Sequence, residues 1–154
     1  MEFKVTDEIK KTASKVVEEY RKSLTSVGLR DSNLYNNCSV DVEFNGNKLQ
    51  VSLFLEPYWK YVEYGRRPNQ KRPPTEVIEK WITEKNIRIT PDPRTNKIPS
   101  TKSVAYVIAR KIGRDGIPAK KPLTKTMYSN NMSNIIFQLK REIVKQLKDQ
   151  LFDN

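Results

Sequence analysis

A hairpin pattern is the strongest constraint on what this chain can fold into. Apolar residues occupy every second position on both sides of the sequence Asn-Gly-Asn at 45–47; they are Val40, Val42, Phe44, Leu49, Val51, Leu53 and Leu55. An alternation with period two is typical of half-buried strands, and Asn and Gly tolerate the positive φ that a tight hairpin turn needs. The sequence therefore predicts an antiparallel hairpin at about residues 39–55. Residues 33–37 are a candidate for a further short strand before it.

Other segments carry apolar residues at the spacing of three and four that is typical of amphipathic helices. They are residues 7–27, 75–86, 103–112 and 124–152. Thr6 or Asp7 can cap the first of these helices, and Gly28 stands where a left-handed residue would end it. Thr75 is the candidate N-cap of the second helix.

The remaining segments are predicted to be irregular. Residues 88–102 contain three prolines and no regular pattern, so we expect an exposed loop that binds something or orders only on assembly. Gly113 and Gly116 are expected to bracket a turn, and residues 117–123 are expected to be extended because proline disfavours helix at the residue before it. The fold class that follows is α+β. One domain over residues 1–154 would have a small antiparallel sheet packed by a long N-terminal and a long C-terminal helix, plus two shorter helices.

Positive charge and low apolar content limit the class of protein. Of 154 residues, 29 are Lys or Arg and 18 are Asp or Glu, which gives a net charge of +11, and 36% are hydrophobic. Such a charge favours contact with nucleic acid, an anionic membrane or an acidic protein; a solvated basic surface without a partner is the alternative. No apolar run approaches the roughly 20 residues of a membrane span, and the first residues lack the apolar core of a signal peptide. We therefore expect synthesis in a cytoplasm.

Residue types that serve catalysis or metal binding are scarce. There is no histidine, and Cys38 is the only cysteine, so neither an intrachain disulfide nor a zinc cluster is possible. Asp41 and Glu43 share one strand face and can in principle hold a metal, but acidic residues are expected on the solvent face of such a strand anyway. The sequence Gly-Arg-Asp-Gly at 113–116 lacks the length and the Lys-Ser/Thr ending of a phosphate-binding loop. We therefore expect no cofactor, no metal and no enzymatic activity.

An aromatic run in the sequence "EPYWKYVEYGRRPNQKRPP" precedes a basic loop. If the run is a strand, Trp59 and Tyr61 face one side. Tyr58 and Tyr64 then face the other side, so that one pair is buried and one pair lies at an interface. If the run is a helix, Tyr58, Tyr61 and Val62 share a face instead.

Two basic clusters offer a nucleic-acid interpretation. The first contains Arg66, Arg67, Lys71 and Arg72, and the second contains Arg110, Lys111, Arg114, Lys120 and Lys121. Basic residues beside aromatic rings suit neutralisation of phosphates and stacking of bases, although no recognised nucleic-acid-binding motif is present. A non-specific nucleic-acid-binding protein that uses the basic loops 65–72 and 110–121 is therefore one candidate function.

Three segments together resemble a known family. They read "YWKYVEYGRRP", "PPTEVIEKWITEKNI" and "AYVIARKIGRDGIPAKKPL", in this order. This pattern is similar to that of the neck and tail-completion family of tailed bacteriophages, which includes minor tail components and head-tail connector proteins. The similar positions are 61–68, Trp81 with Ile82, 105–112 and 116–123, and the order and spacing agree over residues 7–150.

The resemblance implies a structural virion protein that works through protein contacts. Such a protein is synthesised in the bacterial host cytoplasm and forms part of a neck ring between the portal and the tail, which leaves a channel for DNA. Its partners would be copies of itself and neighbouring neck, portal or tail proteins, with transient non-specific contact with phage DNA and no membrane.

The resemblance also implies an interface at the aromatic run and the basic loop. The implied interface residues are Tyr58, Trp59, Tyr61, Tyr64, Arg66, Arg67, Lys71 and Arg72. Because the chain has little apolar content and a long irregular segment, the loops at 66–72 and 88–102 are expected at subunit or partner contacts. Lys120 and Lys121 are the candidate contacts with DNA in the channel.

Overall fold

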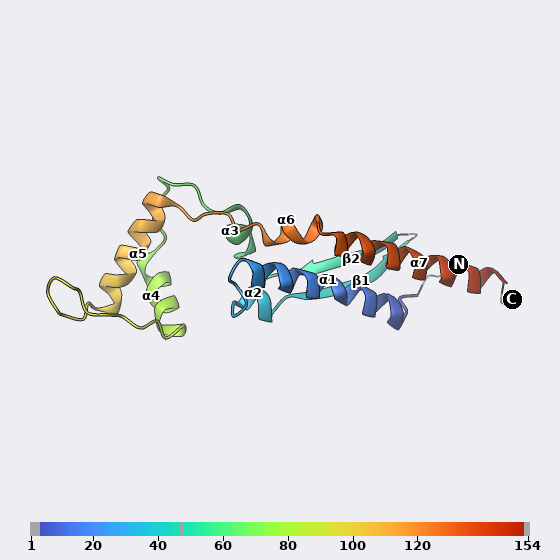
Figure 1. The fold of residues 1–154 in the computed structure, drawn as a ribbon, viewed down its shortest axis with the longest axis horizontal. Coiled ribbons are helices and arrows are strands. Elements are labelled where there is room, and N and C mark those ends of the chain that lie inside the picture. Colours follow the sequence, from blue (N-terminus) through green and yellow to red (C-terminus); the bar gives the residue numbers. More distant parts are fainter. Residues whose placement is uncertain (1–3, 47, 153–154) are drawn as a thin grey trace. The chain divides into compact units, whose positions relative to one another are not determined.

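A computed structural model describes residues 4–46 and 48–152. The elements in chain order are α1 Asp7–Ser26, α2 Asn33–Asn36, β1 Ser39–Asn45, β2 Lys48–Phe54, α3 Trp59–Tyr64, α4 Thr75–Glu84, α5 Thr101–Asp115, α6 Pro122–Met127 and α7 Asn130–Phe152 (Figure 1). They belong to two compact units. The hairpin unit contains the chain up to Glu63 and from Lys120 onward, and the two-helix unit contains Tyr64–Ala119. The predicted α+β class is confirmed, whereas the predicted domain range of 1–154 stays a prediction.

The hairpin forms as predicted. β1 pairs with β2 in an antiparallel register that runs from Ser39 opposite Phe54 to Asn45 opposite Lys48. The apolar residues at alternate positions are half-buried and the residues between them are mostly exposed, as expected for a sheet with one face in the core. Asn47, the third residue of the predicted turn, lies outside the described residues.

Helix α1 begins at the predicted residue and ends at Ser26, one residue before the predicted end. The Thr6 hydroxyl accepts a hydrogen bond from the Ile9 amide, which otherwise lacks a partner in the first turn. At the other end Gly28 has a φ of +76°. The Leu29 amide bonds the Leu24 carbonyl and the Gly28 amide bonds the Thr25 carbonyl, so the last carbonyls of α1 are satisfied by a left-handed glycine cap.

The core of the hairpin unit lies between α1, the hairpin and α7. One buried cluster contains Val17, Tyr20, Leu24, Leu34 and Cys38. A second contains Ile9, Ala13, Ile135 and Leu139, with Val42, Phe44, Leu49 and Val51 of the hairpin packed against it. Both long helices therefore pack with the sheet, which confirms the predicted arrangement.

Three predictions about the hairpin unit were wrong. Residues 33–37 were a candidate strand, but they form α2, because the Ser32 hydroxyl caps Tyr35 and Leu34 is fully buried. The C-terminal helix, predicted as continuous over residues 124–152, is divided into α6 and α7. The Ser129 hydroxyl accepts from the Met132 amide and starts a new helix there. Pro122 begins α6, so the predicted extended segment ends at Lys121.

In the two-helix unit α4 packs against α5. Ile82 of α4 and Ala105, Ala109 and Gly113 of α5 are buried. The loop between them has neither helix nor strand up to Ser100, as predicted. Two details of the prediction were wrong. Pro74, and not Thr75, is the N-cap of α4, and its side chain accepts no hydrogen bond from the first turn of the helix. Gly113 lies inside α5 and not in a turn, and a Cβ atom added there would lie 3.1 Å from the Gln70 carbonyl oxygen.

Within the described residues, no helix combines the length and the apolar character of a membrane span.

Tyr20 makes the stability of the hairpin unit sensitive to alkaline pH. Its side chain is 1% exposed, and burial raises the pKa of the phenol to about 12. The unfolded chain loses this proton near pH 10, so the stabilisation is fully present below pH ~10 and falls as pH rises toward ~12. We expect the urea midpoint of Tyr20→Phe to fall less over this range than that of the unmodified chain. Tyr128→Phe, at a residue 86% exposed, is the control; an equal fall in both variants would contradict the prediction.

Candidate interface around the basic loop

The aromatic run forms helix α3, the second of the two conformations open to it. Trp59 and Val62 pack against the core of the hairpin unit. The Tyr58 hydroxyl accepts a hydrogen bond from the Leu34 amide at 3.1 Å. Tyr61 and Tyr64 are 58% and 70% exposed. Of the four predicted interface aromatics, Trp59 and Tyr58 therefore make contacts within the hairpin unit. Tyr61 and Tyr64 expose aromatic surface to solvent.

Glu63 is the residue of this run that sequence reasoning missed. Its side chain is 2% exposed, and its carboxylate accepts hydrogen bonds from the Leu123 amide at 2.8 Å, the Thr124 amide at 3.0 Å and the Thr124 hydroxyl. These amides belong to the first turn of α6, where no carbonyl of the same helix can reach them. A carboxylate at this end of a helix also meets the positive end of its dipole. Glu63 thus joins α3 to the start of α6.

The backbone of the basic loop is hydrogen-bonded to the end of α5. Arg66 and Ile117 exchange two hydrogen bonds, of 2.8 and 2.9 Å. Farther along, the Asn69 amide bonds the Arg114 carbonyl and the Gln70 amide bonds the Gly113 carbonyl. The loop is therefore held within its own unit along its backbone, and its exposed side chains are the groups that remain to contact a partner.

Two glycines permit this close approach. Gly65 has a φ of +70° and Gly116 a φ of +74°, in the region that favours glycine. A Cβ atom at Gly65 would lie 2.7 Å from the Ala119 nitrogen, and one at Gly116 would lie 2.9 Å from the Pro68 nitrogen. Both distances are too short for a carbon atom. The loop can meet the end of α5 only because these positions carry no side chain.

The two-helix unit collects the first basic cluster and part of the second. The residues are Arg66, Arg67, Lys71, Arg72, Arg110, Lys111 and Arg114. Some of them already have contacts within the unit: an Arg66 guanidinium nitrogen donates to the Lys71 carbonyl, and the Arg72 guanidinium lies 4.8 Å from the centre of the Tyr106 ring. The hydrogen bond from Arg114 lowers the pKa of Asp115, so this pair cancels one positive charge. Arg67, Lys71, Arg110 and Lys111 are exposed.

Lys120 and Lys121, the candidate DNA contacts, belong to the hairpin unit. The Lys120 ammonium group donates to the Val27 carbonyl at 3.0 Å, at the C-terminal end of α1, where a positive charge is favourable. Lys121 is exposed and has a left-handed backbone before α6. These two lysines therefore belong to a different unit from Arg110, Lys111 and Arg114, and their contact with DNA stays a prediction.

Asp41 and Glu43, weighed as metal ligands from the sequence, are both exposed on β1. The described part of the chain holds no group of three or more His, Cys, Asp or Glu side chains placed to share a metal ion.

No known family model, no curated protein and no solved structure matches this chain. The resemblance to the neck and tail-completion family therefore stays a prediction, which depends on the motifs in the sequence.

Proposed function

We propose that this chain is a structural subunit of the neck of a tailed bacteriophage, in a ring that joins the head and portal to the tail around a DNA channel. One observation supports the proposal most directly. The first and third segments that carry the resemblance, which lie far apart in the sequence, are joined by hydrogen bonds: Arg66 pairs with Ile117, and Glu63 accepts a hydrogen bond from the Leu123 amide. Ile82, next to Trp81 of the second segment, is buried in the two-helix unit. The motif residues thus support the local structure of each of the two units, which fits a protein that works through contacts.

In this proposal the basic loop binds acidic surfaces of neighbouring ring proteins. Its backbone is held against α5, so Arg67 and Lys71 extend from a defined support. Charge pairs at the rim of an interface set register and specificity more than raw affinity, which is what a ring of fixed geometry requires. Tight binding to DNA would be a disadvantage in a neck, because every neutralised phosphate strengthens attachment and the genome has to pass through.

A non-specific nucleic-acid-binding protein is the second candidate. The observation that favours it is the collection of basic residues in the two-helix unit, next to the exposed ring of Tyr106. Phosphate contacts by such residues give binding that depends strongly on salt. The two candidates differ in whether the basic loop is needed for assembly or for DNA binding.

The deciding experiment reverses the charge of Arg67 and Lys71 together, by Arg67→Glu with Lys71→Glu. Both side chains are exposed, whereas Arg66 and Arg72 have contacts within the unit that a substitution would also break. The variant is supplied during infection by a phage whose own copy of the gene is inactivated, and complete particles are counted by electron microscopy. We expect at least a tenfold loss of complete particles, roughly the effect of 1.4 kcal/mol per interface.

The control and a DNA-binding assay separate the candidates. Lys10→Glu with Lys11→Glu makes the same charge change on the exposed face of α1 and should leave particle yield unchanged. Duplex DNA should bind the unmodified chain only in the roughly micromolar range of non-specific contact and be released as salt rises. Tight DNA binding at physiological salt that is lost in the Arg67/Lys71 variant, together with normal particle yield, would favour the nucleic-acid-binding protein instead.

A further inference from the structure

Helix α7 carries a row of exposed apolar residues on the side that faces away from the core. Phe137, Val144 and Leu151 are 62%, 49% and 57% exposed and recur every seven residues, so they line one narrow stripe of the helix. Ile135 and Leu139, two residues before and after Phe137, are buried in the core. Two residues turn a helix by about 200°, so this stripe lies opposite the core-facing side.

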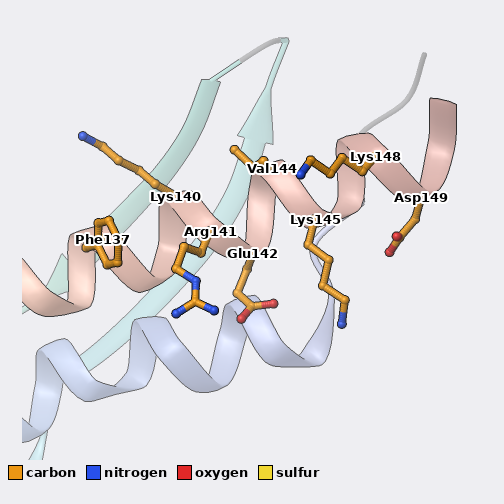
Figure 2. Close-up of a pocket in the computed structure, with 8 residues that line it drawn as sticks. All are labelled: Phe137, Lys140, Arg141, Glu142, Val144, Lys145, Lys148 and Asp149. Carbon is orange, nitrogen blue, oxygen red and sulfur yellow. The ribbon is translucent and has the colours of Figure 1, made fainter. Parts of the chain in front are cut away.

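Basic residues border the stripe. Phe137 and Val144 line a depression of about 550 Å³ along α7 together with Lys140, Arg141, Lys145 and Lys148, and with Glu142 and Asp149. Figure 2 shows Lys140 extending to one side of the helix, and Arg141 and Lys145 extending to the other. Four positive and two negative side chains therefore surround a narrow apolar row. We name this surface, residues 137–151 on the exposed side of α7, the α7 stripe.

We propose that the α7 stripe binds an acidic amphipathic helix of a partner protein. A coiled-coil seam has two apolar positions in each heptad, and the α7 stripe supplies one of them. The positions three and four residues after Phe137 carry Lys140 and Arg141, so a facing helix meets a narrow apolar row with basic groups beside it. Residues that flank such a seam choose the partner through charge. With Lys140, Arg141 and Lys145 on the flanks, the complementary helix carries Glu or Asp beside its apolar row.

Other occupants fit the stripe less well. A second copy of α7 would place positive charge against positive charge: a parallel pair aligns each residue with itself, and an antiparallel pair centred on Val144 aligns Lys140 with Lys148. An interfacial membrane helix normally has a broad apolar face, whereas this row is narrow and has cations on both sides. A phosphate backbone would neutralise the lysines but leave the apolar row in water.

This inference goes beyond the proposed neck function and does not depend on it. The α7 stripe belongs to the hairpin unit, whereas the basic loop belongs to the two-helix unit. A partner helix on α7 would therefore use a surface separate from Arg67 and Lys71, and the two surfaces can be tested by separate substitutions.

The test uses the full chain and three labelled synthetic peptides of about three heptads each. The first has Leu at its seam positions and Glu at the flanking positions, the second has Leu with Lys, and the third has Ser with Glu. Binding is measured by fluorescence anisotropy at physiological salt. We expect the Leu–Glu peptide to bind at least about tenfold more tightly than either of the others.

Substitutions then locate the binding surface. Phe137→Ser with Val144→Ser should weaken the binding of the Leu–Glu peptide by about tenfold or more, and Lys140→Glu with Lys145→Glu should shift the preference to the Leu–Lys peptide. Phe54→Ser, at an exposed residue of β2, and Lys10→Glu with Lys11→Glu are matched controls that should bind like the unmodified chain. Circular dichroism shows whether each variant is folded. All of the substituted side chains are exposed, so we expect every variant to fold. If the serine variant is unstable, the charge-reversal variant still tests the proposal.

Several results of these measurements would contradict the proposed binding of an acidic helix. Equal binding of the Leu–Glu and Leu–Lys peptides, or no binding of the Leu–Glu peptide at about 1 mM, a very weak affinity, would overturn it. So would stripe-dependent binding to phosphatidylglycerol vesicles or to duplex DNA in place of the peptide, or a stripe-dependent dimer in analytical ultracentrifugation.

Discussion

Replacing Gly116 with alanine is expected to destabilise the two-helix unit by about 3 kcal/mol or more. Gly116 ends α5 with φ 74° and ψ −162°, a backbone conformation that is essentially restricted to glycine and that costs another residue about 1–3 kcal/mol. The new Cβ would also overlap the Arg66 carbonyl oxygen and lie 2.9 Å from the Pro68 nitrogen. These neighbours are backbone atoms, so no side-chain rotation can relieve the overlap, and the pairing of Arg66 with Ile117 should be lost.

The measurement combines urea unfolding with amide hydrogen exchange at Arg66 and Ile117, whose amides form the pairing. Gly28→Ala is the matched control, because Gly28 has a similar φ of +76° but no atom within 4 Å of an added Cβ. Gly28→Ala should lower the free energy of unfolding by about 1 kcal/mol, the cost of a positive φ at alanine. The amides of Arg66 and Ile117 should stay protected from exchange. If Gly116→Ala keeps the exchange protection at Arg66 and Ile117, the close contact described here is not present in solution.

Replacing Glu63 with alanine is expected to cost the hairpin unit about 3 kcal/mol. The carboxylate is buried and accepts three hydrogen bonds from Leu123 and Thr124, and a hydrogen bond to a charged group contributes about 1.5–3 kcal/mol. Removing it leaves the first amides of α6 without their acceptor and takes away the negative charge at the positive end of the helix. Glu63→Gln keeps one acceptor oxygen but replaces the other with a donor, so its loss should be smaller.

Urea unfolding at neutral pH measures this difference, with amide exchange at Leu123 and Thr124 as a local readout. Glu18→Ala removes an exposed carboxylate from α1 and should change stability by less than about 0.5 kcal/mol. A Glu63→Ala variant as stable as Glu18→Ala would mean that water replaces the carboxylate without cost and that α6 does not need it.

Glu63 and Gly65 lie two positions apart in the same motif but act in different units. Glu63 holds the first turn of α6 in the hairpin unit, and Gly65 permits the pairing of Arg66 with Ile117 in the two-helix unit. The sequence "VEYGRRP" therefore contains two backbone anchors in addition to its aromatic and basic side chains. Substitutions of Arg67 and Lys71 test the function of the loop without disturbing either anchor.

The sequence by itself determined the elements whose signals are local. The alternation around Asn45 and Gly46 predicted both strands, and Thr6 and Gly28 predicted the ends of α1. These predictions hold because period, cap and turn act between residues at most a few positions apart. The basic loop and the irregular segment before α5 were also predicted from local signals, because glycine, proline and charged residues are read directly from the sequence.

Only the tertiary structure decided what pairs with what. Glu63 and Leu123 are sixty positions apart, and no local pattern marks an acidic residue in an aromatic run as a helix cap. Leu34 is fully buried in the core. Its burial favours a short helix at residues that were a candidate strand from the sequence alone. Arg66 was read as a surface charge, yet its backbone pairs with Ile117. Burial and long-range hydrogen bonds are properties of the folded chain, because their free energy depends on groups that come together only when distant segments pack.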